Sequence, residues 1–281
     1  MAHGISNLPA YSGCNHVNAL YRHSIDNRGV ATLTLTRADV HNAFNDALIA
    51  GLTGALETLG ADEKIRAVVL TGEGASFCAG GDVNWMRDMA AAGKDENKED
   101  ALRLATLMRT LNYLPKPTLA RVNGAALGGG VGLIACCDSA ITVDSAKFGL
   151  TEARLGLVPA VIAPYVFRKI GESAARHYFI KAEIFSAATA LRLGLVHESV
   201  ANDDLDNAVE RHLELLLKTG PNANVFAKRL VYSVAGHDEN RQQRVDEVTA
   251  EMIAELRASD EGREGVAAFL EKRAPGWVSK K

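Results

Sequence analysis

Hydrophobic and polar positions along the chain predict a series of short strands and longer helices. In Gly29–Arg37, apolar residues alternate with threonines, which predicts a strand buried on one face. After Asn45, leucines recur at helical spacing at positions 48, 52, 56 and 59, with Asn45 or Asp46 as the expected N-cap. Compact apolar runs predict further strands at Ile65–Gly72, Thr118–Val122 and Ser139–Val143, and a second leucine stripe predicts a helix over Asp95–Leu114.

The character of the pattern changes after Phe185. From Leu191 to Leu270 the spacing is almost entirely helical, with breaks at Gly220-Pro221 and Gly236. We therefore predict an α/β protein with three parts. These are a flexible tail over residues 1–20, a core that holds the active site over residues 21–190, and a helical region over residues 191–281.

The composition is that of an ordinary globular protein. Of the 281 residues, 47% are hydrophobic and 23% are charged, and a formal net charge of −3 without long blocks of like charge excludes an electrostatic footprint for nucleic acid. Four cysteines without CxxC spacing indicate neither a zinc site nor a disulfide framework. The first twenty residues contain no Lys or Arg, and no apolar run approaches the roughly 18 residues that span a bilayer. We expect a cytoplasmic protein without a membrane partner.

Two glycine loops are the strongest chemical feature of the chain. Ala79–Asp82 reads AGGD and Leu127–Gly130 reads LGGG, and each loop follows an apolar run. Backbone N–H groups that converge from both loops would form an oxyanion hole for the developing charge of a thioester enolate. Two other interpretations stay open. The glycines permit close helix–strand packing only, or Gly130–Ala135 and Glu152 form a dinucleotide fingerprint, to which the match is weak.

Several ordered motifs resemble the enoyl-CoA hydratase/isomerase, or crotonase, family. They are RADVHNAFN from Arg37, SFCAGGDVNWM from Ser76, PKPTLARVNGAALGGGVGL from Pro115, CDSAITVDSAKFGLTEARLGLVP from Cys137 and AAFLEKRAPGW from Ala267. The resemblance covers nearly everything from Tyr21 to Trp277. It implies a crotonase-like spiral of ββα repeats, followed by a C-terminal helical region that drives assembly into a homotrimer or a dimer of trimers.

The resemblance also implies an acyl-CoA thioester as substrate. Its carbonyl oxygen would accept the N–H groups of Gly81 and Gly129, and coenzyme A would enter as part of the substrate, with no separate cofactor and no metal. The residues implied in binding the substrate or its CoA moiety are Val40, Ala79, Gly80, Gly81, Asp82, Val83, Asn84, Pro159, Phe269 and Lys272.

Glu152 is the candidate general acid and base. Hydratases of this family commonly use two glutamates, and the resemblance places one of them at Glu152, in FGLTE, and the other at Gly132. The apolar neighbours of Glu152 favour a raised carboxyl pKa, as acid–base catalysis near neutral pH requires. The loss of the second glutamate leaves hydration and double-bond isomerisation as alternatives. A non-catalytic acyl-CoA-binding subunit is a third possibility.

Two further stretches bear on the acyl group of the substrate. GGGVGL with CCD, and GLVPAVIAPYV from Gly156, are similar to hydratases of branched, carboxylated enoyl-CoAs such as 3-methylglutaconyl-CoA and carboxygeranoyl-CoA. Pro159-Ala160 departs from the Pro-Gly pair of straight-chain hydratases. We hypothesise that a substrate carboxylate helps to hold the attacking water where Gly132 leaves a gap. Arg154 and Arg168 are candidates to bind that carboxylate, although a surface arginine is the simpler interpretation of both.

Overall fold

The computed structural model describes residues 16–17 and 19–279. Most of the predicted tail over residues 1–20, including Cys14, lies outside the described residues. None of the helices in the described part of the chain is long and apolar enough to cross a membrane.

The described residues form two sheets. The larger sheet has seven strands in the order β1-β2-β3-β4-β6-β8-β11, and the smaller has four in the order β10-β9-β7-β5. The strands of the larger sheet are β1 (His16–Val17), β2 (Tyr21–Ile25), β3 (Val30–Leu35), β4 (Ala67–Gly72), β6 (Thr118–Val122), β8 (Ser139–Val143) and β11 (Glu198–Val200). Those of the smaller sheet are β5 (Ser76–Cys78), β7 (Ala125–Leu127), β9 (Lys147–Gly149) and β10 (Ile184–Ser186).

The two sheets are built by repetition of one ββα unit. Strands β4, β6 and β8 pair in parallel in the larger sheet, and the strand after each of them, β5, β7 or β9, pairs in parallel in the smaller sheet. Helices follow each strand pair, so the chain spirals between the sheets and confirms the predicted repeat. Strands β5 and β7 lead directly into the two glycine loops and were not predicted from the sequence, because three residues show too little alternation to be recognised.

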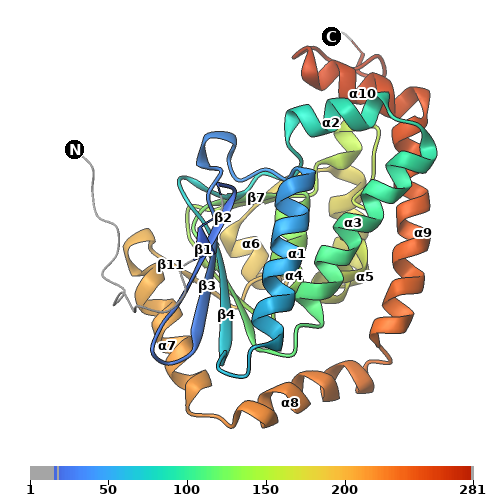
Figure 1. Ribbon diagram of the computed structural model, residues 1–281. Helices are drawn as coiled ribbons and strands as arrows, with labels where there is room; N and C mark the ends of the chain where they lie inside the picture. Colours follow the sequence, from blue (N-terminus) through green and yellow to red (C-terminus); the bar gives the residue numbers. More distant parts are fainter. Residues whose placement is uncertain (1–15, 18, 280–281) are drawn as a thin grey trace.

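Ten α-helices and three short 3₁₀ helices complete the described chain (Figure 1). The α-helices are α1 (Asp46–Ala61), α2 (Val83–Ala91), α3 (Lys94–Asn112), α4 (Gly129–Cys136), α5 (Ala163–Lys181, kinked at Gly171), α6 (Ala187–Arg192), α7 (Leu205–Leu217), α8 (Pro221–Val234), α9 (Glu239–Ala258) and α10 (Asp260–Leu270). The 3₁₀ helices are η1 (Ala38–Val40), η2 (Glu152–Leu155) and η3 (Asn202–Asp204).

Helix α1 shows how the sequence sets the local structure. The Asn45 side chain accepts a hydrogen bond from the Leu48 N–H at 2.9 Å, which confirms Asn45 as the N-cap. The predicted leucine stripe faces the interior, since the four leucines are at most 2% exposed. Burial of that stripe attaches α1 to the sheet.

The C-terminal third needs one correction to the prediction of an almost continuous helical pattern from Leu191. Strand β11 lies in this segment and pairs with β8. The last strand of the larger sheet therefore ends at Val200, and the long helices begin at Leu205. Its three residues are only half-buried and flanked by helical segments, which hides them from a periodicity analysis. In Figure 1 α8 forms an arc below the core, α9 runs back along α3, and α10 ends beside α2.

Candidate active site

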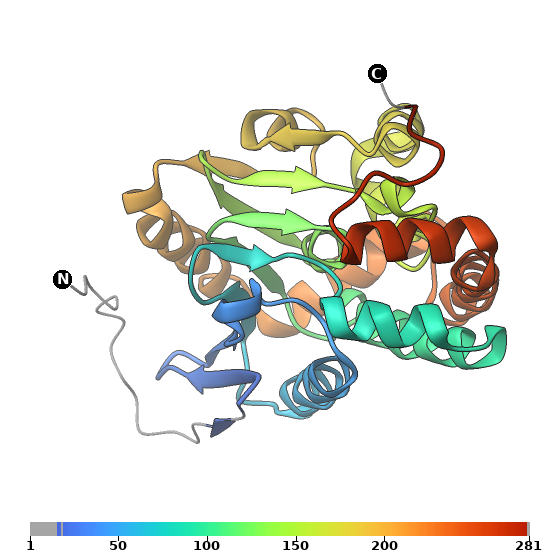
Figure 2. The ribbon, with the colours of Figure 1, turned by 90° about the horizontal axis from the view of Figure 1, so that it is seen from above.

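Three neighbouring strands of the smaller sheet carry the site. Strands β5, β7 and β9 are parallel and adjacent, so their C-terminal ends lie along one edge of the sheet. The residues that follow them are Ala79–Gly81, Gly128–Gly129 and Leu150–Glu152. Both glycine loops and the candidate acid are thereby brought together from distant parts of the sequence. Figure 2 shows these strands running side by side toward α2 and α10.

The two glycine loops lie in direct contact. Gly80 has a φ of +87°, and a Cβ on it would lie 3.0 Å from the carbonyl oxygen of Leu127 in the other loop. Phe44 links the two loops. Its N–H donates to the Gly80 carbonyl at 2.7 Å, and its ring lies 2.6 Å from the position that a Cβ would take on Gly129. A side chain at Gly80 or Gly129 would therefore push the loops apart.

The N–H groups of Gly81 and Gly129 are free donors. Neither donates a hydrogen bond to another group within the described residues. Gly129 is the first residue of α4, where backbone amides lack an intrahelical acceptor and the helix dipole is positive. Two free amides on touching loops are what an oxyanion hole requires.

A cavity of about 440 Å³ opens beside the two loops. The sequence-derived candidates that line it are Ala79, Gly80, Gly81, Gly129, Glu152, Pro159 and Phe269. The candidates that do not line it are Val40, Asp82, Val83, Asn84 and Lys272. Val83 and Asn84 are exposed on the first turn of α2, and Lys272 is exposed just beyond α10. The cavity thus gathers the residues expected near the thioester and leaves out most of those expected near the far end of coenzyme A.

Glu152 faces the second glycine loop from the start of η2. Its Oε1 lies 2.9 Å from the position that a Cβ would take on Gly128, and its buried Oε2 has no hydrogen-bond partner within the described residues. Burial raises the pKa of this carboxyl to about 7, against the opposing effect of a hydrogen bond from its own backbone N–H. A carboxyl with such a pKa exists in both protonation states near neutral pH, which suits it to accept and to return a proton.

The position of the missing second glutamate is filled. A Cβ on Gly132 would lie 2.3 Å from Cγ2 of Ile162 and 3.2 Å from Cε of Met108. Ile162 also lines the cavity, so hydrocarbon occupies the space into which a second carboxylate would project. Among the described residues, Glu152 is the only acidic side chain that lines this cavity.

Gly132→Ala is expected to lower the free energy of unfolding by a net amount of about 1–2 kcal/mol, because the contact with Ile162 outweighs the gain in helix propensity. Gly54→Ala is the matched control. Gly54 also lies within a helix, but nothing approaches its Cβ position within 4 Å, so the substitution should stabilise by about 0.5–1 kcal/mol. Urea denaturation measures both values, and equal changes in the two variants would contradict the close packing at Gly132.

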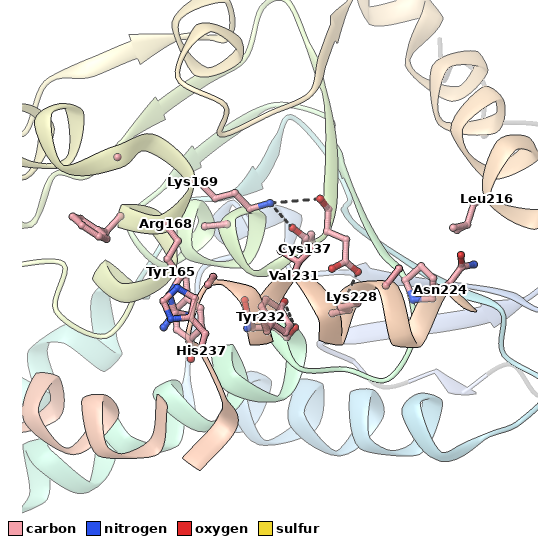
Figure 3. A pocket seen from close by; sticks show the side chains of 18 residues that line it. Cys137, Tyr165, Arg168, Lys169, Leu216, Asn224, Lys228, Val231, Tyr232 and His237 are labelled. Atoms are coloured by element: carbon pink, nitrogen blue, oxygen red, sulfur yellow. Dashed lines mark hydrogen bonds and ion pairs between the residues drawn. The ribbon is translucent and has the colours of Figure 1, made fainter. Parts of the chain in front are cut away.

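The two arginines considered for a substrate carboxylate lie in different cavities. Arg154 lines the cavity of Glu152 and is exposed. Arg168 lines a second cavity of about 780 Å³ between α5 and α8, where its Nη2 donates to Oε1 of Gln242 at 2.7 Å. Figure 3 shows this second cavity. In it Nζ of Lys169 donates to the carbonyl of Cys137, and Nζ of Lys228 donates to Oδ2 of Asp138, each at 3.0 Å. Arg168 is therefore not placed to contact an acyl group that lies beside Glu152.

Asp82 stabilises the glycine loop in which it lies. Its carboxylate caps α2 by accepting the Asn84 N–H at 2.8 Å, and it accepts a second hydrogen bond from Nη2 of Arg37, also at 2.8 Å. Burial disfavours the charged form of Asp82, but the bonds from Arg37 and the backbone outweigh it and lower the pKa. This buried ion pair fixes the loop that presents Gly81.

Other glycines of the second loop serve packing, as one of the alternative interpretations expected. A Cβ on Gly130 would lie 2.2 Å from the carbonyl oxygen of Cys78, so α4 can approach β5 only with glycine there. The dinucleotide interpretation is wrong. The sheet order is that of a spiral of ββα units, and Oε1 of Glu152 lies 2.9 Å from the Cβ position of Gly128, beside the second glycine loop.

Several residues that line the cavity were not predicted from the sequence. They are Trp85 and Met86 of α2, Leu104 of α3, and Ile253 and Arg257 of α9. In the sequence the apolar ones look like core positions of amphipathic helices, and Arg257 looks like a surface charge. The only available signal was the tryptophan within the motif SFCAGGDVNWM.

Comparison with known proteins shows the family of the chain. The profile of the family described as Enoyl-CoA hydratase/isomerase matches residues 26–280. A crotonyl-CoA hydratase of Syntrophomonas wolfei is 31% identical over 256 residues, which cover 89% of this chain and 95% of that protein. The crystal structure of an enoyl-CoA hydratase of Shewanella pealeana is 42% identical with a TM-score of 0.75, over 92% of this chain and 96% of that one.

A second crystal structure extends the likeness in fold. An enoyl-CoA hydratase of Mycobacterium avium is 34% identical and has a TM-score of 0.82, over 93% of this chain and all of that one. The family profile covers the chain from β3 onward, including the smaller sheet, the two glycine loops, Glu152 and the C-terminal helices. The protein therefore belongs to the enoyl-CoA hydratase/isomerase (crotonase) family.

Proposed function

We propose that the protein is an enoyl-CoA hydratase that adds water to a 2-enoyl-CoA thioester. The observation that carries this proposal is the meeting, in one cavity, of two free backbone amides with a carboxyl whose pKa is about 7. The amides of Gly81 and Gly129 suit a thioester oxygen that becomes negative, and Glu152 supplies the proton transfer. The names of the related hydratases support the same reaction.

The proposed mechanism uses Glu152 twice. Its carboxylate accepts a proton from water while the water oxygen bonds to C3 of the enoyl group. The electron pair of the C2–C3 double bond moves toward the thioester, and the amides of Gly81 and Gly129 hold the enolate oxygen. The protonated Glu152 then donates that proton to C2 and restores the thioester carbonyl, which leaves a 3-hydroxyacyl-CoA.

The acyl group is proposed to be branched or to end in a carboxylate, as in 3-methylglutaconyl-CoA. The packing of Ile162 supports this proposal. Ile162 follows the Pro159-Ala160 pair and fills the space at Gly132, so the pocket differs from that of a hydratase with two glutamates. Much of the cavity wall is apolar, and the residues that form it include Trp85, Met86, Leu104, Leu157 and Ile253. An apolar wall of this kind suits the hydrocarbon part of a branched acyl chain.

The remaining predicted contacts are proposed for the distal part of coenzyme A. Val40, Asn84, Val83 and Lys272 lie outside the cavity, as residues that bind the nucleotide end of a long substrate must. Titration of coenzyme A by calorimetry tests this role. Lys272→Ala should weaken binding, and an unchanged dissociation constant would remove Lys272 from the proposed contacts.

Assembly as a homotrimer or a dimer of trimers is also proposed. Helix α8 supports it with a row of apolar side chains that are 61–82% exposed in the single chain, Phe226, Leu230, Val231 and Val234. Sedimentation velocity tests the proposal, and a monomer at micromolar concentration would overturn it.

Isomerisation of a 3-enoyl-CoA is a second candidate function. The single carboxylate in the cavity favours it, because one base is enough to move a proton between two carbons. In this reaction no water is incorporated, so the two functions differ in their products.

The decisive experiment follows the absorbance of the conjugated enoyl thioester with crotonyl-CoA and with 3-methylglutaconyl-CoA. We expect a fall in absorbance with incorporation of ¹⁸O from labelled water. No fall with either substrate, together with a rise in absorbance from a 3-enoyl-CoA, would establish the isomerase instead. Tight binding of thioesters without any change in absorbance would indicate a non-catalytic acyl-CoA-binding subunit.

A further inference from the structure

We propose that Arg257, on α9, is the residue that selects acyl groups ending in a carboxylate. This inference rests on the proposed function, since it concerns the same cavity. The arginine lies far in sequence from both glycine loops and from Glu152, but its side chain lines the cavity that they share.

Arg257 lies where the main cavity meets a smaller one. The smaller cavity, of about 40 Å³, is formed by α2, α10 and Leu157, and it shares Trp85, Met86, Leu157 and Arg257 with the main cavity. An acyl chain that extends past Glu152 into this corner therefore ends beside a guanidinium. The other walls of the corner are apolar.

The guanidinium is held in one orientation. Its Nη1 donates to Oδ2 of Asp100 at 2.8 Å, and its Cζ lies 5.2 Å from the centre of the Trp85 ring. Asp100 is itself fixed, because it is fully buried and its Oδ1 accepts the Trp85 indole N–H at 3.0 Å. The Arg257 side chain is only 13% exposed, so little conformational entropy remains to be lost when a ligand binds.

Most donors of Arg257 remain available to a ligand. A guanidinium carries five N–H groups, and within the described residues only Asp100 accepts a hydrogen bond from this one. The planar fork matches the two oxygens of a carboxylate, and such charge-assisted pairs are stronger in a desolvated site. Because buried cations that face hydrocarbon are costly, the same group disfavours a plain alkyl chain in this corner.

Arg154 is the other candidate to bind the acyl carboxylate, and its surroundings differ from those of Arg257. Among the described residues, Arg154 and Arg257 are the two basic side chains that line the cavity. Arg154 is exposed and, within the described residues, no acidic group pairs with its side chain, so solvent screens it and nothing fixes its orientation. A carboxylate inside the cavity is better matched by the buried and oriented Arg257.

Equilibrium binding of saturated thioesters tests the inference without any need for catalysis. Glutaryl-CoA and pentanoyl-CoA have acyl chains of equal length and differ at the terminal group. We expect the wild-type protein to bind glutaryl-CoA more tightly, measured by isothermal titration calorimetry. Arg257→Lys, which keeps the charge beside Asp100 but loses the fork, should lower the affinity for glutaryl-CoA about 10-fold or more relative to that for pentanoyl-CoA.

Arg103→Lys is the matched control. Arg103 also contacts Asp100, at 3.2 Å, but it lies outside the cavity, so this variant should keep the wild-type ratio of the two affinities. An equal affinity of the wild-type protein for both thioesters would overturn the inference, even if Arg257→Lys does not fold. So would an unchanged ratio in Arg257→Lys. Failure of the proposed function is seen separately, as an absence of hydration of both crotonyl-CoA and 3-methylglutaconyl-CoA.

Discussion

Glu152→Gln is expected to lower kcat for hydration about 100- to 10,000-fold, the usual contribution of a positioned acid–base group. The amide keeps the size of the side chain but can neither accept a proton from water nor return it to C2. The rate is measured from the absorbance of the enoyl thioester at saturating substrate. Glu172→Gln, on the exposed surface of α5, is the control and should retain the wild-type rate. A Glu152→Gln enzyme with more than a tenth of wild-type kcat would assign the proton transfer to another group.

The pH dependence of kcat/KM, compared between the wild type and Glu152→Gln, tests whether the Glu152 carboxyl transfers the proton. Because Glu152 acts first as a base, kcat/KM should rise as the pH is raised through about 7.

The free energy of unfolding should change in the opposite sense. A carboxyl whose folded-state pKa is raised stabilises the fold at low pH and loses that contribution as pH rises from about 4.5 to about 7. Above pH 7 Glu152→Gln should therefore be more stable than the wild type by about 1–3 kcal/mol.

The outline of the fold was predictable because its main elements bury a regular pattern of side chains. The leucine stripe of α1 and its Asn45 cap, and strands β3, β4, β6 and β8, all follow from periodicity and are observed. The short strands β5 and β7 were not predictable in this way. Their pairing is set by the neighbouring strands of the smaller sheet, and three residues carry no usable period.

The centre of the site could be predicted from local motifs, and its periphery could not. Gly81, Gly129 and Glu152 stand in recognisable motifs, and the structure brings them to one edge of the smaller sheet. Arg168 and Arg257 show the limit. Both look like surface charges on helices, yet one faces the second cavity and the other faces Glu152's cavity, because helix packing alone decides which way each points.

The absence of a second glutamate has a structural reason that the sequence did not show. Gly132 by itself suggested an empty space that a substrate carboxylate would fill. The structure shows Ile162 in that space, held at 2.3 Å from the potential Cβ. The glycine at position 132 and the isoleucine at position 162 therefore depend on each other. Replacing Gly132 by a glutamate would also require a smaller residue in place of Ile162.

Gly128→Ala is expected to lower kcat about 100-fold or more, although the substitution adds one methyl group and removes no catalytic group. Gly128 has a φ of +49° and a ψ of −118°, which residues with a Cβ rarely adopt, and the new Cβ would lie 2.9 Å from Oε1 of Glu152. The carboxyl must move, and a displacement of about 1 Å at a reacting group typically costs about 100-fold in rate. Gly93→Ala, with nothing within 4 Å of its Cβ position, is the control and should retain the wild-type kcat.

The double variant Gly128→Ala with Glu152→Gln separates displacement of the carboxyl from general damage to the loop. If the alanine acts through Glu152, the double variant should be about as slow as Glu152→Gln alone, because the methyl group then displaces a side chain that no longer transfers a proton. The comparison is made from kcat at saturating crotonyl-CoA. Losses that multiply would show that Gly128 acts on the oxyanion amides independently, and the close approach of Glu152 to this glycine would then have no part in catalysis.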